Sequence, residues 1–167
     1  MVGLPASGKT TCAHRFAEEC GALLLTPDVW HLRLFGQDAT HEDHDRRHTA
    51  IEIIMWDVAK RVLIHGCDVI LDFGFWGREE RYDFRRRAEA LGIAFQMHYM
   101  DVSREELFRR LEIRNQSETG DTFIIPTEYM ERYIAVFQPP APDELLYVPA
   151  VGQMVNTLAN ENTFQSI

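Results

Sequence analysis

The stretch at residues 3–10 constrains the fold more than any other part of the sequence. It reads Gly-Leu-Pro-Ala-Ser-Gly-Lys-Thr and fits the pattern G-x-x-x-x-G-K-[ST] at every fixed position. Gly3 and Gly8 can adopt backbone angles closed to residues with a Cβ, so successive N–H groups can converge on one anion. A glycine-rich turn before an ordinary helix is the alternative, but a chance match in a chain of this length occurs only about once in a hundred. The stretch therefore predicts a phosphate-binding loop.

The polar positions of this loop have separate tasks in a nucleotide site. A helix that begins in the loop offers unpaired amide donors to phosphate, and Lys9 brings a positive charge to the β- and γ-phosphates. The Thr10 hydroxyl is suited to bind Mg²⁺. The sequence therefore predicts a nucleoside triphosphate and Mg²⁺ as cofactors. ATP is the nucleotide we expect, with GTP left open because the sequence has no visible motif that reads the base. The loop residues predicted to bind the nucleotide are Gly3, Pro5, Ala6, Ser7, Gly8, Lys9, Thr10 and Thr11.

The charge balance of the chain bears on its partners. Lys and Arg number 17 against 26 Asp and Glu, which gives a formal net charge of −9. This balance disfavours nucleic acid, because affinity for a long polyanion depends on neutralising its backbone, but it permits a small substrate in a local basic pocket. The thiols Cys12, Cys20 and Cys67 form no C-x-x-C pair, as is typical of reduced cytosolic cysteines. With no apolar run of about 18 residues and no signal peptide, we expect a cytoplasmic protein without a membrane partner.

Short apolar runs alternate with amphipathic segments along the chain. The runs at residues 22–25, 68–73 and 94–100 are typical of buried parallel strands, and residues 145–148 are a candidate last strand. This alternation predicts an α/β fold with a parallel sheet and right-handed crossovers. Only two residues precede Gly3, so we expect an abbreviated N-terminus. The predicted helices cover residues 10–20, 29–35, 49–64, 78–91, 104–114 and 127–137.

Two aspartates follow the first two predicted strands. Asp28 comes after the first, and Asp72 closes the second. Because the carboxyl ends of parallel strands lie at the edge where ligands bind, both side chains are candidates for the reacting centre. Each has a structural alternative: Asp28 could cap the helix that follows, and Asp72 could be a hydrogen-bonded strand terminus.

A third group of polar residues precedes the long helix. His41, His44 and His48 are spaced i, i+3 and i+7, which places them on one face if this segment is helical. Such a face could bind a metal, but a solvated helix start is the interpretation we favour.

Together these motifs give the chain a resemblance to P-loop kinases that phosphorylate hydroxyl groups on small molecules or nucleic-acid ends. It resembles the 5′-polynucleotide kinase domain, chloramphenicol phosphotransferase, the zeta-toxin group and bacterial predicted ATP-binding kinases. The resemblance covers residues 2–137. It implies a three-layer P-loop NTPase fold, in which a parallel sheet is flanked by helices and carries a small helical lid. The implied kinase domain is residues 1–150 with a lid at about 104–137, and residues 151–167 form a C-terminal tail. The motifs that carry the resemblance are the loop at 3–10, the strand ends at 26–28 and 69–72, the helix start at 78–81, and the arginines at 109, 110 and 114.

The resemblance also implies roles for individual residues. Asp28 would be the base that accepts the proton of the substrate hydroxyl, and Asp72 would lie near Mg²⁺, so that Thr10 and Asp72 are the predicted metal ligands. Arg114 and Arg110 would close over the phosphates from the lid. The residues predicted to be catalytic are Lys9, Asp28 and Arg114.

One position departs from the polynucleotide kinases. They carry an arginine three positions after the base, and this chain has His31 there. We therefore expect a small-molecule hydroxyl as the acceptor. The alternatives are a polynucleotide 5′-hydroxyl kinase and a P-loop ATPase that acts as a nucleotide-dependent switch. Arg78 and Arg81, at the predicted helix start, are either surface residues or part of the site. Nothing in the sequence sets the oligomeric state.

Overall fold

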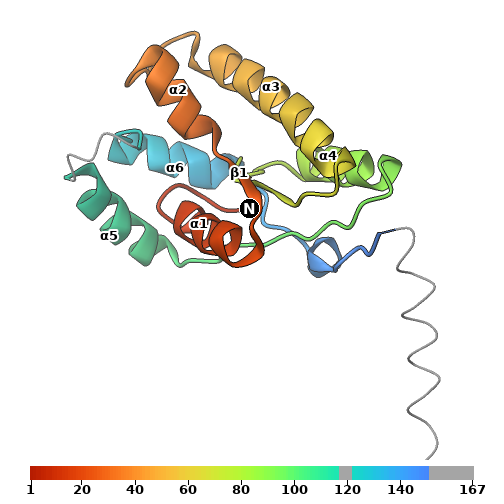
Figure 1. The fold of residues 1–167 in the computed structure, drawn as a ribbon. Helices are drawn as coiled ribbons and strands as arrows, with labels where there is room; N and C mark the ends of the chain where they lie inside the picture. The colour runs from red at the N-terminus through yellow and green to blue at the C-terminus, as the bar shows by residue number, and fades with distance from the viewer. Residues whose placement is uncertain (117–121, 151–167) are drawn as a thin grey trace, which may run out of the picture.

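A short parallel sheet lies between helices in the computed structural model, which describes residues 1–116 and 122–150 (Figure 1). Its two strands are β1 (Leu23–Leu25) and β2 (Val69–Leu71), which pair in parallel along their whole length. Both strands are continuous apolar runs, as expected for strands covered on two faces. The α/β prediction is confirmed with a smaller sheet than expected, while the predicted tail at 151–167 lies outside the described residues.

The residue before the phosphate loop extends this sheet. Val2 forms isolated parallel bridges with Gly74 and with Tyr99. Its N–H donates to the carbonyl of His98 at 2.8 Å, and its carbonyl accepts from the N–H of Met100 at 2.9 Å. The chain that follows β2 therefore lies beside the loop strand, and β1 lies one position farther out. This order brings the ends of both strands to the same edge as the loop.

The strands predicted at residues 94–100 and 145–148 do not form. Residues 94–100 contribute two isolated bridges, a parallel one from Tyr99 to Val2 and an antiparallel one from Phe95 to Val148. Residues 145–148 contribute only this bridge to Phe95. The physical reason is the lack of a partner for a longer ladder, because Val2 offers a single residue of extended backbone before the loop turns away.

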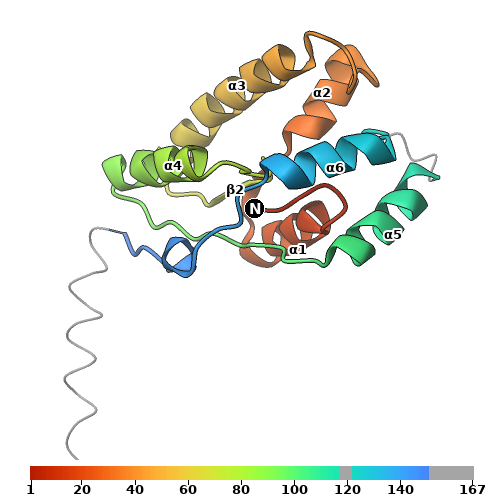
Figure 2. The ribbon, with the colours of Figure 1, turned by 180° about the vertical axis from the view of Figure 1, so that it is seen from behind.

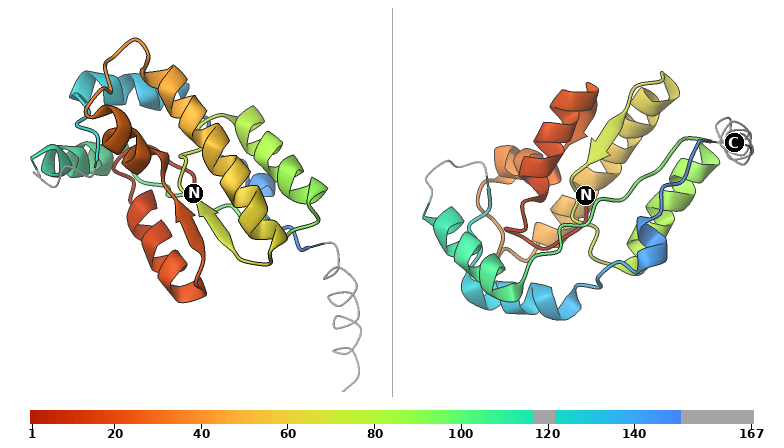
Figure 3. Two further views of the ribbon diagram at one scale, coloured as in Figure 1. Left: turned by 45° about the horizontal axis from the view of Figure 1, so that its top comes forward. Right: turned by 90° about the horizontal axis from the view of Figure 1, so that it is seen from below.

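Helices cover both faces of the sheet. Helix α3 (His44–Ile64) packs on the face that carries Leu25, and α1 (Lys9–Cys20) contacts the same strands. Leu24 points to the opposite face from Leu25 and lines a groove with Ala17 of α1, so α1 lies across the sheet from α3. Figure 3 shows β1 in orange-red and β2 in yellow side by side. The apolar stripe of α3 consists of Ile51, Met55 and Ala59.

The other helices follow their sequence signals closely. The left-handed Gly21 (φ 66°) ends α1, and the Ser103 hydroxyl caps α5 by accepting from the N–H of Glu106, in the Ser-x-x-Glu pattern of residues 103–106. Helix α3 begins at His44 rather than at residue 49, because its polar first turn is held by contacts to Asp38. Within the described part of the chain, no helix has the length and apolar character needed to cross a membrane. The remaining bounds are α2 (Pro27–Phe35), α4 (Arg78–Ala90), α5 (Arg104–Asn115), α6 (Thr127–Val136) and a 3-10 turn (Pro142–Leu145).

The two helices of the predicted lid, α5 and α6, pack against the phosphate loop (Figure 2). Leu4 of the loop belongs to the same apolar cluster as side chains from both helices. The side-chain amide of Asn115 donates to the carbonyl of Ile125 at 2.7 Å and accepts from its N–H at 3.3 Å, which ties the end of α5 to the start of α6. Residues 117–121 of the lid lie outside the described residues. The buried members of the cluster are Leu4, Leu107, Leu111, Phe123, Ile125 and Met130.

A buried arginine fastens the loop after β2 to the end of the described chain. Arg81 is 1% exposed and forms a two-point ion pair with Glu144, with N–O distances of 2.8 and 3.1 Å. It also donates to the carbonyls of Phe75, Trp76 and Gln138. Arg81 is therefore a structural residue, which neither sequence alternative anticipated.

Candidate nucleotide-binding site

The loop at residues 3–10 has the backbone that its sequence predicts. Gly3 has φ 145° and Gly8 has φ 95°, both in the region that favours glycine. A Cβ at Gly3 would also lie 2.9 Å from the Ser7 hydroxyl and 3.2 Å from the carbonyl of Met100, so only glycine fits. Ala6 also adopts a positive φ, of 63°. The loop turns tightly into the start of α1, which leaves the first amides of that helix directed at the cavity.

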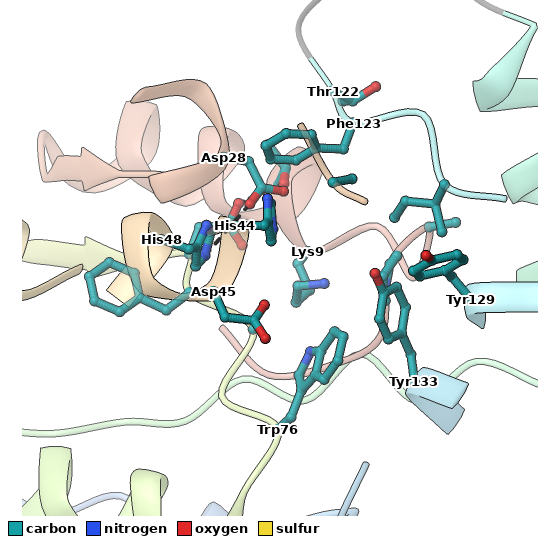
Figure 4. A pocket seen from close by; sticks show the side chains of 18 of the residues that line it. Lys9, Asp28, His44, Asp45, His48, Trp76, Thr122, Phe123, Tyr129 and Tyr133 are labelled. Carbon is teal, nitrogen blue, oxygen red and sulfur yellow. Dashed lines mark hydrogen bonds and ion pairs between the residues drawn. The ribbon is translucent and has the colours of Figure 1, made fainter. Parts of the chain in front are cut away.

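The side chain of Lys9 lies at the centre of this cavity. Figure 4 shows it between Asp28 on one side and Tyr133 on the other. Its ammonium donates to the carbonyl of Leu4 at 2.8 Å, which holds it over the loop. Burial lowers the pKa of Lys9, and the carboxylates of Asp72 and Asp28 oppose that shift. A cation that has lost part of its hydration in this way gains more from a phosphate than an exposed one does.

Thr10 and Asp72, the predicted metal ligands, are in contact. The Thr10 hydroxyl donates to Asp72 Oδ2 at 2.6 Å. Asp72 is 6% exposed, and among the described residues its buried Oδ1 has no hydrogen-bond partner. Burial raises the pKa of Asp72, against the opposing effects of the Thr10 hydrogen bond and the Lys9 charge. A buried carboxylate oxygen without a partner, next to a hydroxyl, is the kind of donor set that suits Mg²⁺.

The two predicted lid arginines both line the cavity from α5, and Arg110 contacts the phosphate loop. Arg110 Nη1 donates to the carbonyl of Ser7 at 3.2 Å, and its Nε donates to Glu106 at 2.6 Å. Arg114 Nη2 donates to the carbonyl of Phe123 at 3.3 Å, while its buried Nε finds no hydrogen-bond partner in the described parts of the chain. Burial lowers the pKa of Arg114, and Asp28 opposes this shift. Both guanidinium groups line the cavity beside the phosphate loop.

Asp28 does not cap a helix. Helix α2 begins at Pro27, one residue before Asp28, so the aspartate lies within the first helical turn and makes no capping hydrogen bond. The side chain is 56% exposed and lines the cavity, where its Oδ1 lies 3.9 Å from His48 Nε2. The structure therefore leaves the carboxylate directed at the space in front of the phosphate loop.

The cavity, of about 1050 Å³, extends beyond Asp28 to carboxyl groups that the sequence analysis missed. Glu52 of α3 is half-buried, and burial together with the charges of Glu80 and Asp28 raises its pKa to about 8. Burial also raises the pKa of Glu80, against the hydrogen bond from the N–H of Gly77. The available signal was the position of Glu52 four residues after His48, which places the two side chains on the same face of the helix.

The three histidines that lie together in the structure are not the three that the sequence analysis grouped on one helical face. His41 precedes α3, so it cannot share a helical face with His44 and His48, and its Nδ1 accepts from the N–H of Asp43 instead. The third member of the cluster is His31 of α2, which is fully buried. In this position His31 does not face the cavity as the arginine of the polynucleotide kinases would.

A glycine-rich loop that opens a helix, a lysine over the loop, and a threonine–aspartate pair at the sheet edge define a P-loop nucleotide-binding protein. The comparisons agree with this class. Residues 1–140 match the model of a protein family described as an AAA domain, and the chain belongs to that family. Membership supports a P-loop NTPase fold with nucleotide binding and a kinase- or ATPase-like activity. A search of curated proteins gave no match.

Proposed function

We propose that this protein is an ATP-dependent kinase that transfers the γ-phosphoryl group to a hydroxyl of a small molecule. The observation that carries the proposal is the exposed carboxylate of Asp28, which lines the same cavity as the phosphate loop and makes no capping bond. An ATPase that only hydrolyses nucleotide needs no cavity of about 1050 Å³ that continues past the loop to further carboxyl groups.

The loop end of the cavity suits the phosphates of ATP. The amides of residues 6–9 would surround the phosphates, while Lys9 and the guanidinium groups of Arg110 and Arg114 offset negative charge as it develops in transfer. Thr10 and Asp72 would hold Mg²⁺. When bound, Mg²⁺ neutralises charge on the β- and γ-phosphates.

The transfer step balances with Asp28 as the base. The acceptor oxygen forms a bond to the γ-phosphorus while the bond from that phosphorus to the β–γ bridging oxygen breaks. The hydroxyl proton passes to Asp28, and ADP leaves with the electron pair of the broken bond. The protein contributes position and charge rather than a covalent intermediate.

A small acceptor is favoured over a nucleic-acid end by the charge beyond Asp28. The cavity walls on that side carry Glu42, Asp45, Glu52 and Glu80. The negative charges of Glu42 and Asp45 would repel the phosphates that flank a terminal nucleotide, and the net charge of −9 adds to the repulsion. His31, which stands in the place of the phosphate-binding arginine, is buried away from the cavity.

The direct experiment measures ADP production by the purified protein with pooled hydroxyl compounds: metabolites, nucleosides, antibiotics and oligonucleotides. We expect a strong increase with one class of small molecule. A slow rate that no compound increases would contradict the kinase proposal and support the ATPase switch. Labelled phosphate appearing only on oligonucleotide 5′ ends would instead support the polynucleotide kinase.

Two matched variants then separate the aspartates. Asp28→Asn keeps the shape of the side chain but cannot take the proton, so the acceptor-dependent kcat should fall by about 10²-fold or more, with little change in Mg·ATP affinity. Asp72→Asn should weaken Mg²⁺ dependence and ATP binding. The two variants are titrated separately with Mg·ATP and with acceptor, and the reverse pattern would show that the assigned roles are wrong.

A further inference from the structure

Three histidines from two helices converge beside the candidate kinase site. His31 comes from α2, and His44 and His48 come from the first turns of α3. One ring nitrogen from each lies within 4.8 Å of the other two, and the Nδ1 atoms of His31 and His48 are 3.3 Å apart. His31 is fully buried, while His44 and His48 are half-buried and line the cavity (Figure 4).

A buried carboxylate orients two of these rings. Asp38 Oδ1 is hydrogen-bonded to Nδ1 of His44 at 2.8 Å, and it lies 2.7 Å from Nε2 of His31 in an ion-pair contact that lacks hydrogen-bond geometry. The other oxygen of Asp38 accepts from Arg47 Nη1 at 2.8 Å, which keeps the carboxylate ionised and able only to accept. The facing nitrogens of His31 and His44 therefore carry the protons. The lone pairs are then on Nδ1 of His31 and Nε2 of His44, the nitrogens that remain for a ligand.

The distances fit a tetrahedral metal. Zinc binds histidine nitrogen at about 2.0–2.1 Å, so two nitrogens at a tetrahedral angle lie about 3.3–3.4 Å apart. The separation of the His31 and His48 Nδ1 atoms, 3.3 Å, equals this value. A small rotation of side chains would bring the whole set, which now spans up to 4.8 Å, to the same spacing.

We propose that His31, His44 and His48 bind one Zn²⁺ ion, with Asp38 as the residue that positions the rings of His31 and His44. A carboxylate that holds the second nitrogen of a ligating histidine is a common feature of zinc sites. Three histidines leave a fourth position, and because His44 and His48 line the cavity, that position faces it. The ion would also tie α2 to α3.

The surroundings favour a metal over a plain hydrogen-bonded cluster. A hydrogen bond between the two Nδ1 atoms, 3.3 Å apart, requires His48 to carry its proton on Nδ1, because the proton of His31 lies on the nitrogen that faces Asp38. The carboxylate of Asp28 instead faces Nε2 of His48 and favours the proton there, which leaves two Nδ1 lone pairs that a cation satisfies. The rings of Phe35 and Phe123 pack edge-on against His31, which gives the site an apolar wall that limits water. The nitrogen ligands also separate this site from the Thr10–Asp72 pair, whose oxygens suit Mg²⁺.

The test uses the untagged full chain, stripped with a chelator and titrated with Zn²⁺ in competition with a chromogenic chelator. We expect one tightly bound zinc per chain, a higher melting temperature with Zn²⁺, and no displacement by excess Mg²⁺. X-ray absorption of the zinc protein should show three nitrogen ligands at about 2.0–2.1 Å. A folded wild-type chain that binds no zinc tightly would overturn the proposal.

The variants change the half-buried His44 and His48, because replacing the fully buried His31 could prevent folding. His44→Gln and His48→Gln should each abolish tight binding, and His41→Gln, in the adjacent exposed segment, should bind zinc as the wild type does. Asp38→Asn should weaken the affinity by about 10–100-fold without removing a ligand. Circular dichroism confirms that each variant is folded. Zinc binding with unchanged affinity in the folded His44→Gln/His48→Gln double variant would refute the site, and none of these measurements depends on kinase activity.

Discussion

Replacing Glu52 with glutamine should make the protein more stable at neutral and alkaline pH. Burial and the nearby charges of Glu80 and Asp28 raise the pKa of Glu52 from 4.5 to about 8. Because this pKa is raised on folding, the folded protein holds a proton that the unfolded chain releases. The resulting stability is fully present below the unfolded pKa and is lost as pH rises through the folded value. Because glutamine cannot ionise, the variant does not lose this part of its unfolding free energy as the pH rises.

The size of the effect follows from the two pKa values. Each unit of difference is worth about 1.4 kcal/mol, so a shift from 4.5 to about 8 sets a ceiling of about 5 kcal/mol. Most of this change falls between about pH 5 and pH 8, where the linkage relation gives about 3 kcal/mol. The unfolding free energy of Glu52→Gln minus that of the wild type should therefore grow by about 3 kcal/mol over this range.

The assay is urea unfolding of both proteins at a series of pH values. Glu79→Gln, on the exposed surface of α4, is the matched control, and its difference from the wild type should stay constant with pH. If the difference for Glu52→Gln is also constant between these limits, Glu52 ionises in the folded protein as it does in the unfolded chain. The electrostatic description of this end of the cavity would then be wrong.

Two further substitutions test the loop and the buried ion pair. Lys9→Ala should reduce ATP turnover to background, while Lys60→Ala, at a partly exposed position of α3 outside the cavity, should leave it unchanged. Full turnover in a folded Lys9→Ala protein would contradict the phosphate-loop assignment. Arg81→Gln should lower the unfolding free energy by about 3–5 kcal/mol in urea titrations, because Glu144 loses its partner. Arg78→Gln, its exposed neighbour, should change it little, and equal stability of the two variants would refute the structural role of Arg81.

The parts of the fold that depend only on residues close together in the sequence could be predicted from it. The phosphate loop requires particular backbone angles within eight residues, and Gly3 and Gly8 adopt them. The stop of α1 at Gly21 and the cap of α5 at Ser103 are local in the same way. The placement of Asp72 beside Thr10 also followed, because the order of parallel strands limits which strand ends can meet.

The features that were missed depend on contacts between distant segments. His31 meets His48 only because α2 folds back on α3, and Arg81 finds Glu144 from 63 residues away. Neither pairing leaves a periodic signal in the sequence. The strand predicted at residues 94–100 does not form for a related reason, because an apolar run forms a ladder only where a neighbouring strand supplies hydrogen bonds.

The charges along the cavity suit the two reactants of the proposed kinase reaction, one at each end. At the loop end, Lys9 and Arg114 are cations that meet phosphate. At the other end, His48 Nε2 lies 3.9 Å from Asp28 and 3.6 Å from Glu52, so the two carboxyl groups flank one ring. Because the pKa of Glu52 is about 8, it keeps its proton at neutral pH and can donate a hydrogen bond, while the carboxylate of Asp28 accepts one. A hydroxyl oxygen both donates and accepts, whereas a phosphate only accepts and would be repelled by Asp28. The pair therefore favours an alcohol over a phosphate as the group bound beside Asp28.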